Sequence, residues 1–206
     1  MYPWVETIWI HKGRVQNLPY HQRRFDATRH AHFQFVSNID LSPLLSRNHA
    51  ASDIKCRILY TDTIQDIQYT LYEWHPIHTL AILEHNTIHY PYKSTHRPDL
   101  DNLYAQRGTA DEILILRNGL FTDAYYYNLV FQNKEGLFTP KTPILPGTMR
   151  QKLLDKGIIQ VRDISLDDLR DYDTVCLINA FNPLWSQLQI TRLRITNCAI
   201  TNANLE

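Results

Sequence analysis

Short runs of β-branched and aromatic residues dominate the first part of the chain and are typical of strands. WVETIWI (4–10) is followed by a His11-Lys12-Gly13 turn and a second extended stretch at 14–18, which predicts a β-hairpin. Pro19 suits the first turn of a helix, which we expect to extend to about Phe35.

Within that helix, spacings of three and four residues place His21, Arg24 and Thr28 on one side. We expect further elements in this half of the chain, a short helix around 41–47 and strands at 54–61, 67–74 and 79–83. Residues 1–88 are therefore predicted to form a small lobe in which helices pack on an antiparallel sheet.

The texture of the sequence changes at HYPYKSTHRPDL (89–100), which contains two prolines and has no sustained periodicity. We take this segment as the start of a larger C-terminal lobe, residues 89–206. Asn118-Gly119 predicts a hairpin after the strand EILILR (112–117). The remaining predicted elements are helices near 99–107, 147–157 and 165–168, and strands near 120–123, 128–132, 136–139, 158–164 and 173–179.

The balance of charge and the few cysteines argue against several kinds of partner. Twenty-one Lys and Arg residues balance twenty-one Asp and Glu residues, so no overall field would draw the chain to nucleic acid or to an anionic membrane. Cys56, Cys176 and Cys198 lack metal-ligand spacing, so we expect no disulfide framework, no metal site and a cytoplasmic location. Polar residues interrupt each apolar run near the start, so we expect neither a signal peptide nor a membrane span.

Taken alone, the residues that could carry chemistry have ordinary explanations. Lys93 could be a solvated surface lysine and Arg24 a surface ion-pair partner. Asp123 could be a turn residue, and Gly147-Thr148 could simply begin a helix. Neither composition nor periodicity by itself indicates an enzyme.

Several segments in a fixed order change this interpretation. Val5-Glu6-Thr7 and a Gly-Arg turn precede HQRRF (21–25), and KSTHR (93–97) has the form Lys-x-x-x-Arg. The long stretch ADEILILRNGLFTDAYYYNLVF (110–131) places Asp123 five positions before Asn128. TPKTPILPGTMRQ (139–151) and INAFNPLW (178–185) follow.

From about residue 4 to residue 185, this order resembles the class IV (fold-type IV) aminotransferase family, and most closely its aminodeoxychorismate lyase branch. The resemblance implies an α/β fold of two lobes, like that of D-amino acid aminotransferase, with most of the cofactor site in the larger lobe. It also implies a homodimer, a small amino substrate and pyridoxal 5′-phosphate (PLP) as cofactor.

The resemblance assigns a role to each candidate residue. Lys93 would carry the cofactor covalently and then move a proton as a base. Arg24 would bind the cofactor phosphate, while Asp123 would face the pyridine nitrogen and keep it protonated. In the family, the cofactor phosphate is also bound at a helix start, which corresponds to Gly147 and Thr148 here, with Asn179 and Ala180 completing the phosphate site. Asn128 belongs to the same cofactor-binding set. His21 and Arg97 are second-rank candidates for the site.

The function implied is a lyase that converts 4-amino-4-deoxychorismate to 4-aminobenzoate and pyruvate. The alternatives are a class IV aminotransferase acting on a small branched-chain or D-amino acid, and a relative that binds PLP without catalysis. The sequence departs from the family in having Asp123 where Glu is usual, and in starting close to the Glu-Thr strand without the arm found in longer relatives. We find no Tyr-x-Arg pair of the kind with which branched-chain enzymes hold an α-carboxylate, which counts mildly against that alternative.

Overall fold

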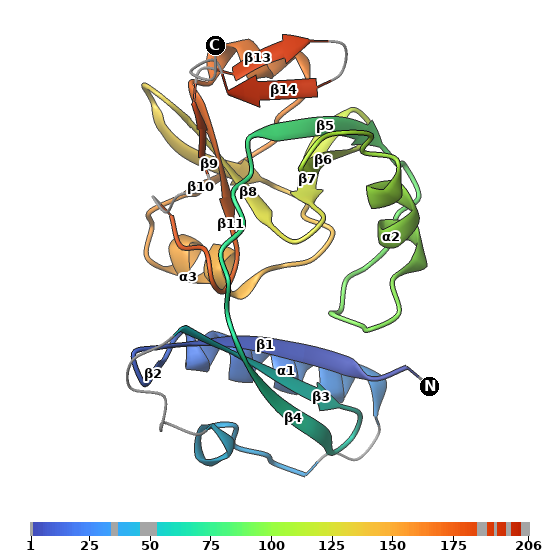
Figure 1. The fold of residues 1–206 in the computed structure, drawn as a ribbon, viewed down its shortest axis with the longest axis vertical. Coiled ribbons are helices and arrows are strands. Elements are labelled where there is room, and N and C mark those ends of the chain that lie inside the picture. The colour runs from blue at the N-terminus through green and yellow to red at the C-terminus, as the bar shows by residue number, and fades with distance from the viewer. Residues whose placement is uncertain are drawn as a thin grey trace. The chain divides into compact units, whose positions relative to one another are not determined.

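The computed structural model describes residues 2–33, 37–45 and 53–184, and beyond these only the backbone of 189–191, 193–196 and 199–202. The chain divides into two compact units (Figure 1). The first is Met1–Trp74 with Tyr92–His96, and the second is His75–Pro91 with Arg97–Glu206.

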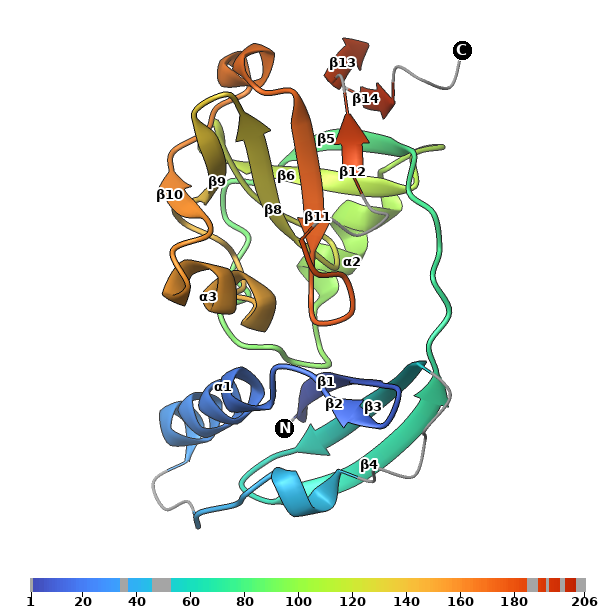
Figure 2. The ribbon, with the colours of Figure 1, turned by 90° about the vertical axis from the view of Figure 1, so that its left-hand side faces the viewer.

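The first unit is an antiparallel sheet with a helix on one face, as Figures 1 and 2 show. Its strand order is β2-β1-β3-β4, and β1 pairs along its whole length with β3. The elements are β1 (Trp4–His11), β2 (Arg14–Val15), α1 (Leu18–His32), the 3-10 helix η1 (Ser42–Leu44), β3 (Asp53–Tyr60) and β4 (Ile64–Leu71).

Buried and less buried side chains alternate along β1 and β3, and the buried ones mark the sheet face that the helix covers. Ile8 and Ile10 on β1, and Cys56 and Ile58 on β3, are fully buried and pack with Phe25 of α1. Because strand side chains point to opposite faces in turn, the even-numbered residues of β1 all face the helix. Glu6 is one of these residues, which places a carboxylate inside an apolar layer.

The predicted hairpin at the start of the chain is confirmed, since β1 and β2 are antiparallel neighbours. β2 is shorter than expected because α1 already begins at Leu18. α1 ends at His32, and Phe33 is extended, while 34–36 lie outside the described residues. The predicted helix at 41–47 is a 3-10 turn in its described part, and the strand predicted at 67–74 runs from Ile64 to Leu71 instead.

The second unit is built on a larger sheet, in which β6 and β8 are central. Among the described residues the order is β10-β9-β8-β7-β6-β5-β14-β13, and β11 pairs with β8 and β12. The strands are β5 (Thr79–Glu84), β6 (Glu112–Arg117), β7 (Leu120–Ala124), β8 (Asn128–Asn133), β9 (Gly136–Pro140), β10 (Gln160–Arg162), β11 (Thr174–Ile178), β12 (Gln189–Thr191), β13 (Leu193–Thr196) and β14 (Ala199–Asn202). The helices are α2 (Pro98–Ala105), α3 (Thr148–Asp155) and the 3-10 helix η2 (Asp167–Asp171).

The hairpin turn predicted at Asn118-Gly119 is confirmed, and a glycine also ends α3. Asn118 and Gly119 both have positive φ, 53° and 76°, and join β6 to its antiparallel neighbour β7. Gly157 closes α3 with a φ of 64°, and its N–H donates to the Leu154 carbonyl while Ile158 N–H donates to Leu153, the two bonds of a Schellman cap.

The division between the units differs from the boundary predicted at residue 88. β5 lies before that boundary but pairs in parallel with β6, and its Leu80 and Ile82 belong to the core of the second unit. Tyr92–His96 returns to the first unit. A boundary drawn from composition missed this exchange because it depends on strand pairing between distant parts of the chain.

Candidate functional site

A buried network joins β1 to α1 in the first unit. Arg24 Nε and Nη2 donate to the two carboxylate oxygens of Glu6 at 2.8 and 2.7 Å, and His21 Nδ1 lies 2.6 Å from Glu6 Oε2. Since His21 and Arg24 are three residues apart on α1, both reach the same strand residue. Glu6 and His21 are completely buried.

The charges of this network are strongly coupled. Burial alone would raise the pKa of Glu6, but the Arg24 charge and the hydrogen bonds from His21 and Arg24 outweigh it and lower that pKa to about 2. Burial lowers the pKa of His21, and the positive charges of Arg24 and Lys93 act in the same direction against the Glu6 carboxylate. Glu6 is therefore ionised at neutral pH.

Lys93 is held in the first unit through its backbone. Its carbonyl accepts a hydrogen bond from Val5 N–H at 2.9 Å, and Thr95 N–H donates to the Pro3 carbonyl at 3.0 Å. Ser94 forms a β-bridge with Trp4. The segment thus runs beside the start of β1, one strand position from Glu6, and the charge of Lys93 acts on His21.

In the second unit, Asp123 and Asn128 face each other at the end of β7 and the start of β8. Asn128 Nδ2 donates to Asp123 Oδ1 at 2.5 Å and to the Leu145 carbonyl at 2.9 Å. Asp123 Oδ2 accepts the backbone N–H groups of Ile144 and Leu145. Burial raises the pKa of Asp123 to about 6, although the hydrogen bonds from Leu145, Asn128 and Ile144 oppose the rise.

Gly147 and Thr148 follow that loop directly and begin α3. Gly147 is the N-cap with an extended backbone, and Thr148 is buried. A Cβ atom on residue 147 would overlap the Asn128 side chain, so any other residue there requires Asn128 or the start of α3 to shift. The first turn of α3 carries no acidic residue, which leaves the positive end of the helix dipole without a carboxylate of its own.

Asn179 and Ala180 form the turn after β11 and lie beside the same strand end. Ile178 is the register partner of Asn128, and Asn179 Nδ2 donates to the Tyr126 carbonyl at 3.3 Å. Asn179 Oδ1 accepts the N–H groups of Phe181 and Asn182, which fixes the turn. The structure therefore gathers all six predicted residues of the second unit around the start of β8 and of α3.

Arg97, ranked second in the sequence, contacts an aromatic and acidic cluster. Its guanidinium donates to the Tyr125 hydroxyl at 2.7 Å and lies 3.2 Å from the Asp101 carboxylate. It also lies 4.2 Å and 4.8 Å from the ring centroids of Tyr125 and Tyr126. These contacts give Arg97 the ordinary role of an ion-pair partner of a nearby acid.

Sequence reasoning left without a role two buried charged residues that contact the candidate site, Glu6 and Arg150. Glu6 was quoted only as part of a motif, although a carboxylate within WVETIWI is itself a signal that something must pair with it. Arg150 is buried, donates to Thr139 Oγ1 and the Pro140 carbonyl, and its charge acts on Asp123. The Gly-x-x-Arg spacing was the signal for Arg150.

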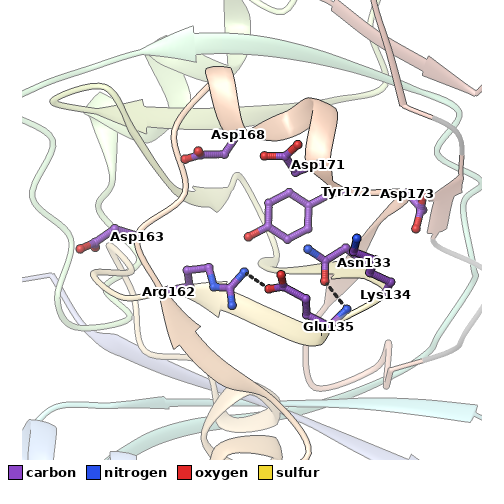
Figure 3. Close-up of a pocket in the computed structure, with 9 residues that line it drawn as sticks. All are labelled: Asn133, Lys134, Glu135, Arg162, Asp163, Asp168, Asp171, Tyr172 and Asp173. Carbon is purple, nitrogen blue, oxygen red and sulfur yellow. Dashed lines mark hydrogen bonds and ion pairs between the residues drawn. The ribbon is translucent and has the colours of Figure 1, made fainter.

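A separate cavity of about 480 Å³ in the second unit includes none of the predicted residues. Figure 3 shows Arg162 and Glu135 paired across it, at 3.0 Å. The lining residues are Asn133, Lys134, Glu135, Arg162, Asp163, Asp168, Asp171, Tyr172 and Asp173.

The part of the chain that the structure describes offers neither a metal centre nor a membrane-spanning helix. In that part of the chain no group of three or more His, Cys, Asp or Glu side chains is arranged to hold a metal ion. No helix there is both long and apolar enough to cross a membrane. Cys56 and Cys176 are free thiols in the interior, and Cys198 lies outside the described residues.

Comparison with known proteins identifies the family. The chain matches the family model of class IV amino-transferases over residues 4–190. An uncharacterised protein of Haemophilus influenzae is 36% identical over 188 residues, which cover 89% of this chain and 100% of that protein.

Solved structures agree with this result. A proposed 4-amino-4-deoxychorismate lyase from Haemophilus somnus has a TM-score of 0.83 and 33% identity, with 89% of this chain and 98% of that chain covered. A hypothetical aminotransferase from Mycobacterium tuberculosis in its PLP-bound form has a TM-score of 0.72 at 16% identity, covering 88% and 78% of the two chains, and so supports the fold alone.

This chain belongs to the class IV aminotransferases, a family of PLP-dependent enzymes. The predicted α/β fold of fold-type IV is confirmed. Each unit by itself contains residues that fit such a cofactor. In the first unit, Arg24 is fixed by a buried acid and suits an anion. In the second unit, the start of α3 carries no acidic residue and also suits an anion. The buried Asp123, whose pKa is raised, suits a positively charged ring nitrogen.

Proposed function

We propose that this protein is a PLP-dependent lyase that converts 4-amino-4-deoxychorismate to 4-aminobenzoate and pyruvate. The observation that carries the proposal is the pairing of Arg24 and His21 with the buried Glu6, together with the charge of Lys93 acting on His21. A lysine fixed by β-pairing in the same unit as an oriented guanidinium suits a group that has an aldehyde and a phosphate. The resemblance to the Haemophilus somnus protein favours the lyase over other family activities.

In this proposal, the family resemblance assigns the cofactor phosphate to Arg24 of the first unit and to the start of α3 of the second, and each is considered within its own unit. Arg24 supplies guanidinium donors, and the backbone N–H groups and hydroxyl of Gly147-Thr148 supply the rest together with the helix dipole. The turn at Asn179 and Ala180 completes the phosphate site of the second unit. Asn128 acts by holding both Asp123 and the loop that leads to Gly147.

Asp123 is proposed to accept a hydrogen bond from the protonated ring nitrogen. When bound, the cofactor supplies an electron sink for the carbanion that forms at the amine-bearing carbon of the substrate. An ionised carboxylate beside the ring nitrogen keeps the proton there, and the resulting ion pair would lower the raised pKa of Asp123.

Lys93 is proposed to carry the cofactor and to act as the base. The Lys93 amine would hold the aldehyde of the cofactor and, when free, would remove the proton from the amine-bearing carbon of the substrate. Loss of pyruvate leaves an aromatic ring, and this aromatisation drives the reaction.

The test is to incubate the purified protein with PLP and 4-amino-4-deoxychorismate and to follow fluorescent 4-aminobenzoate. The proposal expects 4-aminobenzoate and pyruvate in equal amounts. Amino-group transfer to a 2-oxo acid without 4-aminobenzoate would assign the protein to the aminotransferases instead. A protein that takes up no PLP would support neither reaction and would overturn the assignment.

We also propose that the enzyme is a cytoplasmic homodimer, as the family resemblance implies. The free, buried thiols of Cys56 and Cys176 are compatible with a reducing compartment. Sedimentation of the PLP-loaded protein would measure the mass of the particle, and a monomer with full activity would contradict the dimer.

A further inference from the structure

Glu6 is a fully buried carboxylate that accepts hydrogen bonds from two residues of one helix, His21 and Arg24 of α1. An isolated buried charge is costly, so its partners must be well aligned. Three donors meet this need, since Arg24 Nε and Nη2 and His21 Nδ1 all lie within 2.8 Å of the carboxylate oxygens. The network is therefore an element of local geometry and not a loose surface pair.

The paired contact fixes the plane of the Arg24 guanidinium. Two parallel N–H donors on two carboxylate oxygens allow little rotation, and the Arg24 side chain is only 17% exposed. Nη1 is not part of this pair, and its direction is set once the other two nitrogens are fixed. A lysine at this position would offer a point charge without that fixed fork.

The same carboxylate determines the protonation of His21. Burial favours the neutral ring, and the ionised Glu6 can only accept a hydrogen bond. The proton of the neutral ring must therefore be on Nδ1, the nitrogen that lies 2.6 Å from Glu6. Glu6 thus sets the orientation of one side chain and the tautomer of the other.

We propose that Glu6 is a positioning residue that orients Arg24 for the phosphate monoester of the cofactor, with the buried His21 as the second partner of the carboxylate. The proposal rests on the proposed function, because it takes Arg24 as the phosphate ligand. Glu6 itself would not touch the cofactor, since it is enclosed between β1 and α1. It acts through the helix residues, and the recognition that it supports is specific to the phosphate.

This role differs from that of a carboxylate that only neutralises buried charge. If Glu6 merely stabilised the fold, its removal would weaken all forms of the cofactor equally or none of them. If it acts through Arg24, its removal would weaken PLP but spare pyridoxal, which has the same ring and aldehyde and no phosphate.

The experiment measures dissociation constants of PLP and pyridoxal by quenching of tryptophan fluorescence in the apoprotein. Glu6→Gln should raise the dissociation constant of PLP about tenfold or more, as loss of a residue that orients a ligand typically does. The dissociation constant of pyridoxal should stay within about twofold of the wild-type value. Glu6→Asp should lie between this variant and the wild type. Glu112→Gln, a substitution of another buried acid outside the network, is the matched control and should change neither constant.

Non-additivity provides a second readout. Arg24→Gln should cause the same PLP-specific loss, and Glu6→Gln combined with Arg24→Gln should be no worse than Arg24→Gln alone. Equal losses for PLP and pyridoxal, or additive losses in the double variant, would overturn the positioning role. A wild-type protein that binds PLP no better than pyridoxal would instead overturn the proposed role of Arg24.

Wild-type protein alone gives a further test in case Glu6→Gln does not fold. Nitrogen-15 NMR of labelled histidine distinguishes the two neutral tautomers from the cation. The proposal expects a neutral His21 protonated on Nδ1 at neutral pH. A proton on Nε2, or on both nitrogens, would overturn the inferred control by Glu6.

Discussion

The backbone of Gly147 lies directly against the Asn128 amide, so closely that a Cβ atom on residue 147 would overlap Asn128 Oδ1. Asn128 in turn is fixed by Asp123 and by the Leu145 carbonyl. The start of α3 is therefore fixed in place by the same amide that orients the buried carboxylate.

Replacement of Gly147 by alanine should disturb this contact. The added methyl group must displace Asn128 or the start of α3, which should lower the free energy of unfolding by about 1–3 kcal/mol. Urea titration measures the change. Gly108→Ala is the control for glycine loss, because it meets no neighbour and costs only about 1–2 kcal/mol of left-handed backbone strain. In an Asn128→Ala background the cost of Gly147→Ala should shrink, and an unchanged cost would show that the overlap is relieved elsewhere.

A second prediction concerns Glu112, a buried acid at the start of β6. It accepts the N–H groups of Ile113 and Tyr125, yet burial raises its pKa to about 7. A folded-state pKa above the unfolded value of 4.5 means that its protonated form contributes stability below about pH 4.5, and that this contribution is lost as the pH rises through about 7. The loss should be on the order of 3 kcal/mol.

Glu112→Gln should remove this pH dependence. A glutamine keeps an acceptor for the two N–H groups and carries no charge, so the variant should be more stable than the wild type at pH 8 and similar at pH 4.5. Unfolding free energies across this range measure the difference, with the exposed Glu73→Gln as control. Parallel curves for wild type and Glu112→Gln would show that the pKa of Glu112 is the same in the folded and unfolded protein, which would contradict the prediction.

Much of the fold could be predicted from local patterns, and the exceptions have physical causes. The Asn118-Gly119 hairpin and the Gly157 cap were predictable because each depends on residues that tolerate positive φ. The division between the units was not, since the place of β5 is decided by pairing with β6 about thirty residues later. The secondary-structure propensity of a segment does not indicate which distant strand it will pair with.

The same distinction holds for the candidate site. Motif order selected Arg24, Lys93 and Asp123, and the structure places each beside other candidates. The pairing of Glu6 with Arg24 could not be read from a motif, because it requires knowing that even-numbered residues of β1 face α1. Burial, which makes that pairing necessary, is a property of the folded chain.

Asp123→Asn is predicted to cause a modest loss of folding stability and a much larger loss of activity. An asparagine oxygen can accept from Ile144 and Leu145, but its NH₂ group would then face the NH₂ group of Asn128, with a cost of about 1–3 kcal/mol. Activity should fall by roughly a hundredfold or more, because a neutral amide does not hold a proton on the ring nitrogen. Rates of 4-aminobenzoate formation and unfolding curves measure the two effects. A stable variant with normal kcat would remove Asp123 from the proposed chemistry.

The substitution Lys93→Ala tests the covalent assignment most directly. The backbone bonds of this segment do not involve the lysine side chain, so the first unit should keep its fold and its melting temperature within about 2 °C, as expected for the loss of a side chain that is not part of a core. Borohydride reduction of the PLP-loaded wild type, followed by peptide mass spectrometry, should place the modification on Lys93. The variant should still bind PLP through the residues that hold its phosphate, but it should form no reducible adduct and no 4-aminobenzoate. Lys55→Ala is the matched control and should behave as wild type. Lys55 lies on β3 and alternates with the buried Ile54 and Cys56, so it is on the sheet face that α1 does not cover. An adduct on another lysine, or activity that survives Lys93→Ala, would require a different base and a different placement of the cofactor.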